Sequence, residues 1–189
     1  MTNVYFVRHA ESDNRVRDNL LRPLTEKGAG DCMLVTGFLR DKGISRIYSS
    51  PFKRAMDTLG GLSALLGIPI IPLDAFSERK ISDGWVDDYE AYARNQWRDF
   101  SFKLPGGESL HEVQARNIEV LLDILRRHPG ESIAIGSHGT ALSTVVNHYD
   151  PAFGYEQFLE ILDLMPWLVH LSFDGSRCVG IRSINLFEP

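Results

Sequence analysis

The sequence has few cysteines and no long apolar run, and both absences restrict what the protein can be. Its 189 residues contain two cysteines, Cys32 and Cys178, which lack the spacing of metal ligands. We expect both to be buried or half-buried thiols in a reducing compartment. No segment is apolar enough to cross a membrane, and the N-terminus lacks the basic stretch of a secretion signal. These features predict a cytoplasmic protein without a membrane partner.

Positive charge is also scarce, which limits the partners that the whole surface can attract. The chain has 20 Lys and Arg against 25 Asp and Glu, a formal net charge of −5. A negative molecule has no general attraction to nucleic acid, so we expect no nucleic-acid partner. Any site for an anion must therefore be a local basic pocket. The composition leaves the oligomeric state open.

Three signatures of other hydrolases and phosphate-binding proteins are missing. His111 and Glu112 begin a zinc-binding His-Glu-x-x-His pattern, but residue 115 is alanine. The sequence has no Gly-x4-Gly-Lys loop and no Gly-x-Ser-x-Gly turn. We therefore expect chemistry that requires neither a metal nor a cofactor.

Strand and helix patterns alternate along the chain. Apolar runs predict strands at residues 4–7, 47–48, 68–71, 132–137, 169–173 and 179–184. Helical spacing predicts helices at 25–42, 50–66, 109–127 and 158–164, one from about 86 and one after 139. This alternation indicates one α/β domain spanning 1–189, in three α/β/α layers around a mostly parallel sheet. Residues 76–106 are the least regular part and predict a cap-like excursion.

Local signals suggest where several elements begin and end. Thr25 is an expected N-cap, and Gly43 is the expected stop of the same helix. Ser50 followed by Pro51 predicts another helix start, with serine as the cap and proline in the first position. Pro69 interrupts the third strand, which we therefore expect at an edge of the sheet.

Polar residues follow three of the predicted strands. The first strand ends in Arg8 and His9, the second leads into a helix with Arg54 in its first turn, and the fourth ends in Ser137-His138-Gly139. Each feature alone is more often a solvated or structural residue than a functional one. If the strands are parallel neighbours, however, two imidazoles and two guanidiniums meet beside two helix N-termini. Such a cluster of cations and free N–H groups suits a phosphoryl group.

Five short motifs are similar to those of a known family. In chain order they are Val7-Arg8-His9-Ala10-Glu11-Ser12, Pro23-Leu24-Thr25-x-x-Gly28, Tyr48-Ser49-Ser50-Pro51-x-x-Arg54-Ala55-x-x-Thr58, Pro105-Gly106-Gly107-Glu108-Ser109 and Gly136-Ser137-His138-Gly139. Their types and order resemble the histidine phosphatase superfamily, which includes the cofactor-dependent phosphoglycerate mutases. The resemblance runs from residue 4 to about 140 and implies the same three-layer fold.

The resemblance also implies roles for individual residues. His9 would be the nucleophile that becomes phosphohistidine, and Glu78 would be the general acid, with Asp83 as a nearby competitor. The side chains that would hold the phosphoryl oxygens are Arg8, Arg54 and His138. The positions that would contact the substrate are Asn14, Ser137 and Gly139.

Two departures from the family pattern affect this comparison. Ala10 replaces a commoner glycine, a change that restricts the backbone only slightly. The stretch from Asn14 to Pro23 lacks the usual Gly-x-x-Asp element, so substrate contacts from this loop do not carry over.

We predict a phosphomonoesterase that hydrolyses a small phosphorylated molecule through a phosphohistidine on His9. One alternative is a phosphoglycerate mutase-type phosphotransferase, although the span from Glu78 to Pro105 is short and carries several acids. Another is a catalytically weak module that binds phosphate or a phosphopeptide.

Residues near the excursion are candidates for holding the rest of the substrate. Lys53, Arg79 and Lys80 suggest a preference for an anionic substrate tail. Aromatic residues could line the same pocket, although such spacing is more typical of core; they are Trp85, Tyr89, Tyr92 and Trp97.

Overall fold

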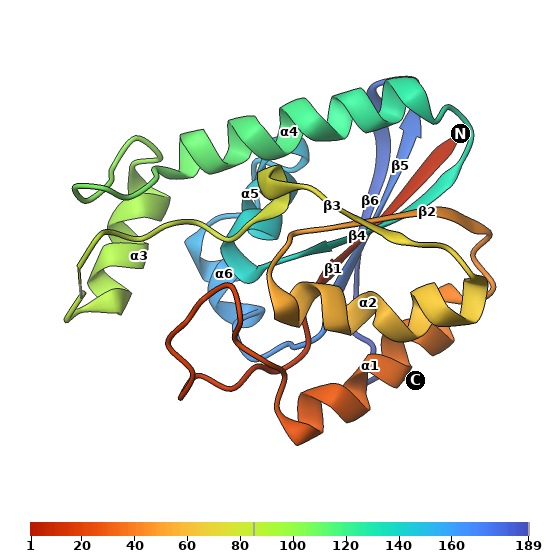
Figure 1. The fold of residues 1–189 in the computed structure, drawn as a ribbon. Helices are drawn as coiled ribbons and strands as arrows, with labels where there is room; N and C mark the ends of the chain where they lie inside the picture. Colours follow the sequence, from red (N-terminus) through yellow and green to blue (C-terminus); the bar gives the residue numbers. More distant parts are fainter. Residues whose placement is uncertain (85, 189) are drawn as a thin grey trace.

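A six-stranded sheet forms the centre of the computed structural model, which describes residues 1–84 and 86–188 (Figure 1). The strands are β1 Thr2–Arg8, β2 Ile44–Ser49, β3 Ile70–Pro72, β4 Ser132–Ser137, β5 Trp167–Asp174 and β6 Arg177–Ile184. Their spatial order is β3-β2-β4-β1-β5-β6. The first four in this order pair in parallel, and β5 and β6 join them in antiparallel orientation. The predicted α/β fold with a mostly parallel sheet is confirmed.

Helices cover both faces of this sheet. They are α1 Glu26–Leu39, α2 Lys53–Leu66, α3 Tyr89–Arg98, α4 Leu110–Arg127, α5 Gly139–Tyr149 and α6 Tyr155–Glu160, with a short 3-10 turn, η1, at Asp74–Phe76. Helices α1 and α2 lie on one face, and α4 and α5 lie on the other (Figure 1). Successive side chains of β1 enter different cores because strand residues alternate in direction, Val4 and Phe6 on the α4 side and Tyr5 and Val7 on the α1 side. None of the helices in the described ranges has the length and apolar character needed to span a bilayer.

The predicted N-cap of α1 is present, and a close backbone contact in the first turn of the helix explains why residue 28 is glycine. Thr25 Oγ1 accepts a hydrogen bond of 3.0 Å from the backbone N–H of Gly28. A Cβ atom on Gly28 would lie 2.1 Å from the backbone oxygen of Glu11. The glycine in Pro23-Leu24-Thr25-x-x-Gly28 therefore lets the helix pack directly against the loop that follows β1.

Several predicted boundaries were wrong. Helix α1 ends at Leu39, three residues before the expected end, and turns lead to Gly43 at φ 66°. Helix α2 begins at Lys53, with Phe52 as its N-cap residue. Ser50 therefore does not cap it, and Pro51 is not in its first position.

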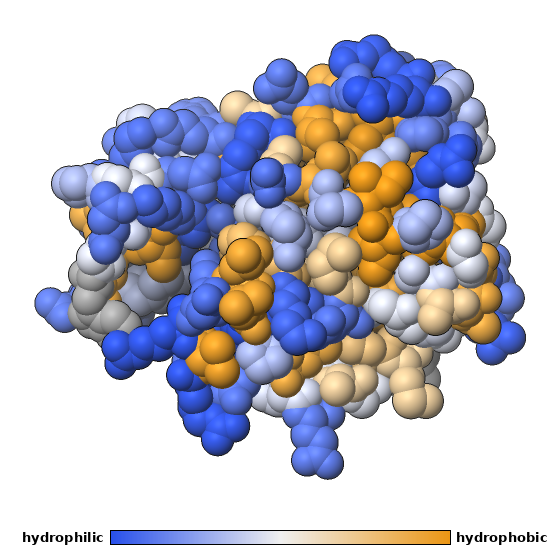
Figure 2. All heavy atoms as spheres, viewed as in Figure 1, coloured by the Kyte–Doolittle hydropathy of each residue, from blue (hydrophilic) through white to orange (hydrophobic). Residues whose placement is uncertain are grey.

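Two other helices, α3 and α6, also differ from their predicted ranges. Helix α3 begins at Tyr89 rather than near 86, and α6 spans Tyr155–Glu160 rather than 158–164. The sheet predictions fared better. Strand β3 lies at an edge of the sheet, as Pro69 indicated. In Figure 2, apolar side chains gather on the surface between α4 and β3. Ile71 of β3 is 41% exposed.

The excursion at 76–106 packs against the main core through aromatic side chains, among them Trp97. Trp97 of α3 is buried, and its ring centroid lies 5.3 Å from that of Phe158 and 6.0 Å from that of Phe153. Tyr92 is also buried, so both residues are core as expected, whereas Tyr89 remains 42% exposed. Trp85 lies outside the described residues.

Candidate active site

The carboxyl ends of β1, β2 and β4 bring the predicted site residues together. Strand β4 lies between the other two, and Arg8 pairs in register with Ser137. The backbone N–H of His9 donates to the Ser137 carbonyl at 3.1 Å, and the His9 and His138 ring centroids lie 5.2 Å apart. Arg8, His9, Arg54 and His138 are all buried. Parallel strand order therefore produces the cluster that the sequence predicted.

The ring of His9 is held by hydrogen bonds at both nitrogens, in an arrangement that leaves Nε2 unprotonated. Its Nδ1 lies 2.7 Å from the carbonyl oxygen of Ala10, an arrangement in which Nδ1 carries the proton and donates it. Its Nε2 accepts a hydrogen bond of 3.1 Å from Nε of Arg54. Burial, together with the charges of Arg54 and Arg8, lowers the pKa of His9 to about 3. The imidazole is therefore neutral at pH 7.

The two arginines are fixed by hydrogen bonds to backbone carbonyls from different parts of the chain. Arg54 Nη1 donates to the Asn19 carbonyl at 2.7 Å, and burial lowers the pKa of Arg54 to about 10. Arg8 Nη1 donates to the Ile161 and Leu162 carbonyls, at 2.5 and 3.0 Å. Arg8 Nε is buried without a hydrogen-bond partner among the described residues. Both guanidiniums thus keep hydrogen-bond donors for an anion while their orientation is set by the fold.

His138 precedes α5 and contacts the serine that was expected to cap α2. Its Nε2 lies 2.8 Å from Ser50 Oγ. Burial and the neighbouring cations hold the pKa of His138 well below its usual value, so this imidazole is also neutral at pH 7. A neutral ring with one N–H can donate a hydrogen bond to a phosphoryl oxygen without adding charge.

Glu78 reaches the same place from the excursion. Its Oε2 accepts from the Thr140 N–H at 3.0 Å, and its Oε1 accepts from the Ala141 N–H at 3.1 Å. The carboxylate therefore lies at the N-terminus of α5, where free N–H groups favour negative charge. Burial lowers the pKa values of Arg8 and Arg54, and the charge of Glu78 partly opposes this shift, as expected for a near neighbour.

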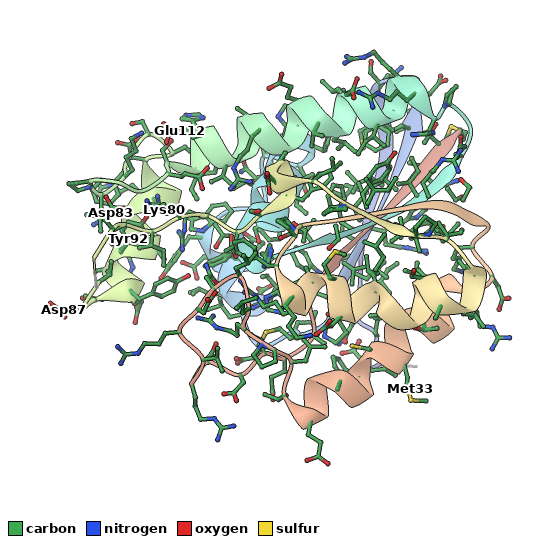
Figure 3. All side chains as sticks on the ribbon, in the orientation of Figure 1. Met33, Lys80, Asp83, Asp87, Tyr92 and Glu112 are labelled. Atoms are coloured by element: carbon green, nitrogen blue, oxygen red, sulfur yellow. The ribbon has the colours of Figure 1, made fainter. Side chains whose placement is uncertain are left out.

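Asp83 lies elsewhere. It forms an ion pair of 2.6 Å with Lys80, and 73% of its side chain is exposed. Figure 3 shows the two labelled side chains next to each other in the excursion. Of the two candidate carboxylates, Glu78 is the one that joins the cluster.

The loop that carries Glu78 is anchored by one ion pair. Arg116 of α4 donates from Nε and Nη2 to the two carboxylate oxygens of Glu108, at 2.8 and 3.1 Å. Its Nη1 also donates to the carbonyls of Ala75 and Ser77, at 2.6 and 2.9 Å. Arg116 thereby fixes the backbone just before Glu78.

The three predicted substrate-contact positions differ in their placement. Ser137 Oγ is buried without a partner among the described residues. A Cβ atom on Gly139 would lie 3.2 Å from Arg8 Nε, so glycine makes room for the guanidinium. Asn14 is exposed, and its Oδ1 lies 3.5 Å from Nη1 of Arg22.

The cations proposed to hold an anionic tail are occupied by other groups. Lys53 pairs with Asp57 at 2.7 Å. Lys80 pairs with Asp83, and Arg79 is buried, where it donates to Gln96 Oε1 and to Tyr89 Oη.

One residue near the cluster, Arg22, was not singled out from the sequence. Burial is the main cause of the lowered pKa values of His9 and Arg54, and the charge of Arg22 adds to both shifts, so Arg22 lies close to the site. The position of Arg22 immediately before Pro23-Leu24-Thr25 was the available signal.

The fold and this cluster bring two guanidiniums and two neutral imidazoles together at the carboxyl ends of parallel strands. The chain belongs to the histidine phosphatase superfamily (branch 1), whose family description matches residues 4–178. Among the residues described, no group of three or more His, Cys, Asp or Glu side chains is arranged to hold a metal ion.

Similar proteins carry both phosphatase and mutase names. The chain is 30% identical over 161 residues to a probable phosphoglycerate mutase GpmB of Enterobacter sp. (strain 638), covering 78% of this chain and 74% of that protein. The fold matches Bacillus stearothermophilus YhfR with a TM-score of 0.75 at 24% identity, over 94% of both chains. It also matches a phosphoserine phosphatase from Entamoeba histolytica with a TM-score of 0.77 at 18% identity, over 98% and 97% of the chains. These solved structures establish the shared fold alone.

Proposed function

We propose that the protein is a phosphomonoesterase that hydrolyses a small phosphorylated molecule through a phosphohistidine on His9. The observation that carries this proposal is the pairing of a neutral His9, with Nε2 unprotonated, and the Glu78 carboxylate in one buried group of cations. A nucleophile and a proton carrier are the two parts that a covalent route to phosphate-ester hydrolysis requires.

In the first step, the Nε2 lone pair of His9 attacks phosphorus and the ester P–O bond breaks. Arg8, Arg54 and His138 stabilise the charge on the equatorial oxygens by fixed hydrogen-bond donors. Glu78, in its protonated form, gives its proton to the departing oxygen. The products are an alcohol, phosphohistidine and the Glu78 carboxylate.

In the second step, water attacks the phosphohistidine and the N–P bond breaks. Glu78 takes a proton from the attacking water and is ready for another cycle. Throughout, Nδ1 of His9 keeps its proton and donates it in a hydrogen bond to the Ala10 carbonyl, which keeps the ring in one orientation. Inorganic phosphate leaves last.

Replacement of His9 tests the covalent route. His9→Ala should abolish turnover of p-nitrophenyl phosphate. Brief incubation of the wild-type protein with ³²P-labelled substrate, followed by alkaline denaturation, should leave acid-labile label on the protein. A His9→Ala protein that turns over at the wild-type rate would exclude the proposal.

Replacement of Glu78 tests the proton carrier. Glu78→Gln should lower kcat for an alkyl phosphate by about 10²–10⁴-fold, the usual contribution of a positioned general acid. The loss on p-nitrophenyl phosphate should be much smaller, because its leaving group departs without a proton. Asp83→Asn is the matched control and should leave both rates within about twofold. Equal losses on the two substrates would remove Glu78 from this role.

A mutase is the second candidate, favoured by the names of the curated relatives. It must return the phosphoryl group to the substrate and exclude water. The short span from Glu78 to Pro105, with its several acids, favours hydrolysis instead. Addition of a bisphosphoglycerate primer with 3-phosphoglycerate, followed by ³¹P NMR, separates the two, since a mutase gives 2-phosphoglycerate and a phosphatase gives inorganic phosphate.

A binding module that has lost catalysis is the third candidate. The presence of both His9 and Glu78 in one cluster argues against it. A phosphopeptide that binds tightly and survives hours with the wild-type protein would favour this alternative.

A further inference from the structure

The loop between β1 and α1 brings a third guanidinium to the cluster. The loop closes on itself through a bridge between Ser12 and Leu24, and it reaches over the site because the Asn19 carbonyl accepts from Arg54. Arg22 lies inside this loop, half-buried. Its Nε donates to the Val16 carbonyl at 2.8 Å, and this hydrogen bond restrains the orientation of the guanidinium.

Arg22 has no acidic partner. Its hydrogen bonds go to the Val16 carbonyl and, at 3.5 Å, to Asn14 Oδ1, and no ion pair forms between it and a carboxylate within the described ranges. Arg15 of the same loop differs from it because Arg15 is paired with Asp13, and Arg54 of α2 donates to His9. A half-buried guanidinium held only by neutral oxygens retains most of its capacity to bind an anion.

The charge of Arg22 acts on the groups that would surround the phosphoryl group. Together with the stronger effects of burial, it lowers the pKa values of both His9 and Arg54. Repulsion between Arg22 and Arg54 opposes this arrangement unless an anion lies between them. Arg8, Arg54 and Arg22 each carry +1, so a bound phosphoryl dianion offsets two of these three charges.

We propose that Arg22 is a further phosphoryl-binding residue, which donates from its guanidinium to the group transferred to His9. This inference deepens the proposed function and rests on it. Asn14 would then act as a positioning residue, because its side-chain oxygen accepts from Arg22 rather than contacting the substrate. Because Arg22 binds the phosphoryl group in this proposal, the rest of the substrate does not need a second anionic group.

Three variants test the proposal. Arg22→Gln should lower kcat/KM by about 10–100-fold on every phosphomonoester, the size expected when one hydrogen bond to a charged group is lost. The loss should be equal for p-nitrophenyl phosphate and for substrates with a second anionic group. Arg22→Lys keeps the charge without the planar fork and should fall between Arg22→Gln and the wild type. Arg15→Gln is the matched control, since Arg15 is on the same loop, paired with Asp13 and 90% exposed, and it should stay within about twofold of the wild type.

Phosphate affinity gives a readout that does not depend on turnover. Titration calorimetry with inorganic phosphate should show about 10-fold or greater weakening in Arg22→Gln and none in Arg15→Gln. Added guanidinium should restore part of the activity of Arg22→Ala, which a merely loosened loop would not show.

The outcomes separate this inference from the proposed function. Wild-type hydrolysis that depends on His9, with unchanged activity and phosphate affinity in Arg22→Gln, would overturn the role of Arg22 and leave the phosphatase standing. A loss confined to substrates with a second anion would also overturn it. A wild-type protein that binds phosphate but does not hydrolyse esters would sink the proposed function, and the calorimetric comparison would still decide on Arg22. A wild-type protein that binds no phosphate would overturn both.

Discussion

At the scale of single residues, burial of uncharged imidazoles is the property on which the chemistry depends. A histidine in water is partly protonated near neutral pH, and a protonated ring cannot attack phosphorus. His9 avoids this state because it is buried beside Arg54 and Arg8, which lowers its pKa from 6.5 to about 3. The neutral imidazole adds no charge to the site, so the arginines around it remain available to an incoming anion.

This burial predicts a dependence of folding stability on pH. The unfolded chain binds a proton at His9 as the pH falls below 6.5, whereas the folded protein binds it only near pH 3, so stability decreases as the pH falls through this window. Between pH 7.5 and 4.5 the contribution of His9 is about 2–3 kcal/mol. Urea unfolding at both pH values should show a smaller decrease in His9→Asn than in the wild type. The same decrease in both proteins would contradict the assignment.

At the scale of elements, loop anchoring matters as much as strand order. Strands β1, β2 and β4 deliver His9, Arg54 and His138, but Glu78 comes from an irregular stretch that needs other support. Arg116 of α4 supplies it through Glu108 and two backbone carbonyls. The N-terminus of α5 then holds the carboxylate of Glu78 itself.

Loss of this anchor should affect catalysis selectively. Arg116→Gln should lower kcat about 10-fold for an alkyl phosphate and much less for p-nitrophenyl phosphate, because a displaced Glu78 fails only where the leaving group needs a proton. Unfolding free energy should fall by about 2–4 kcal/mol, since Glu108 loses its partner in a mostly buried pair. The control is Arg126→Gln, whose exposed pair with Asp123 should contribute little. Equal losses on both substrates would show a general structural defect instead.

At the scale of the whole molecule, the excursion and the sheet share one core. Trp97 contacts Phe158 and Phe153, and buried Gln96 donates to the carbonyls of Phe102 and Glu108. These contacts join α3 to the layer formed by α4, α5 and α6. We therefore predict that the chain unfolds as a single domain.

Removal of the Trp97 side chain tests this connection. Trp97→Ala should reduce the unfolding free energy by about 3–5 kcal/mol, the usual effect of deleting a large buried aromatic. Urea unfolding followed by circular dichroism and by tyrosine fluorescence should still give one coincident transition. Leu65→Ala, on an exposed position of α2, should change stability by less than about 0.5 kcal/mol. Two separate transitions in the wild type would show that the excursion unfolds on its own.

The sequence by itself determined the order of strands and helices along the chain and the cap at Thr25. It also determined which side chains cluster once the strands are parallel neighbours: Arg8, His9, Arg54 and His138. These features depend on interactions over a few residues, or on the general rule that parallel strands expose their carboxyl ends together. It missed that α2 starts at Lys53, because a serine followed by proline satisfies the local rule for a helix start.

Only the tertiary structure decided the rest. It placed the Ser50 hydroxyl beside His138, Glu78 rather than Asp83 at α5, and the charge of Arg22 near His9. The Glu78 carboxylate and its partner Thr140 are 62 residues apart, and no local pattern encodes a contact at that distance. Such contacts depend on the path that a loop takes over the folded sheet. Burial and the need to hydrogen-bond buried polar groups then decide which of several possible partners a side chain contacts.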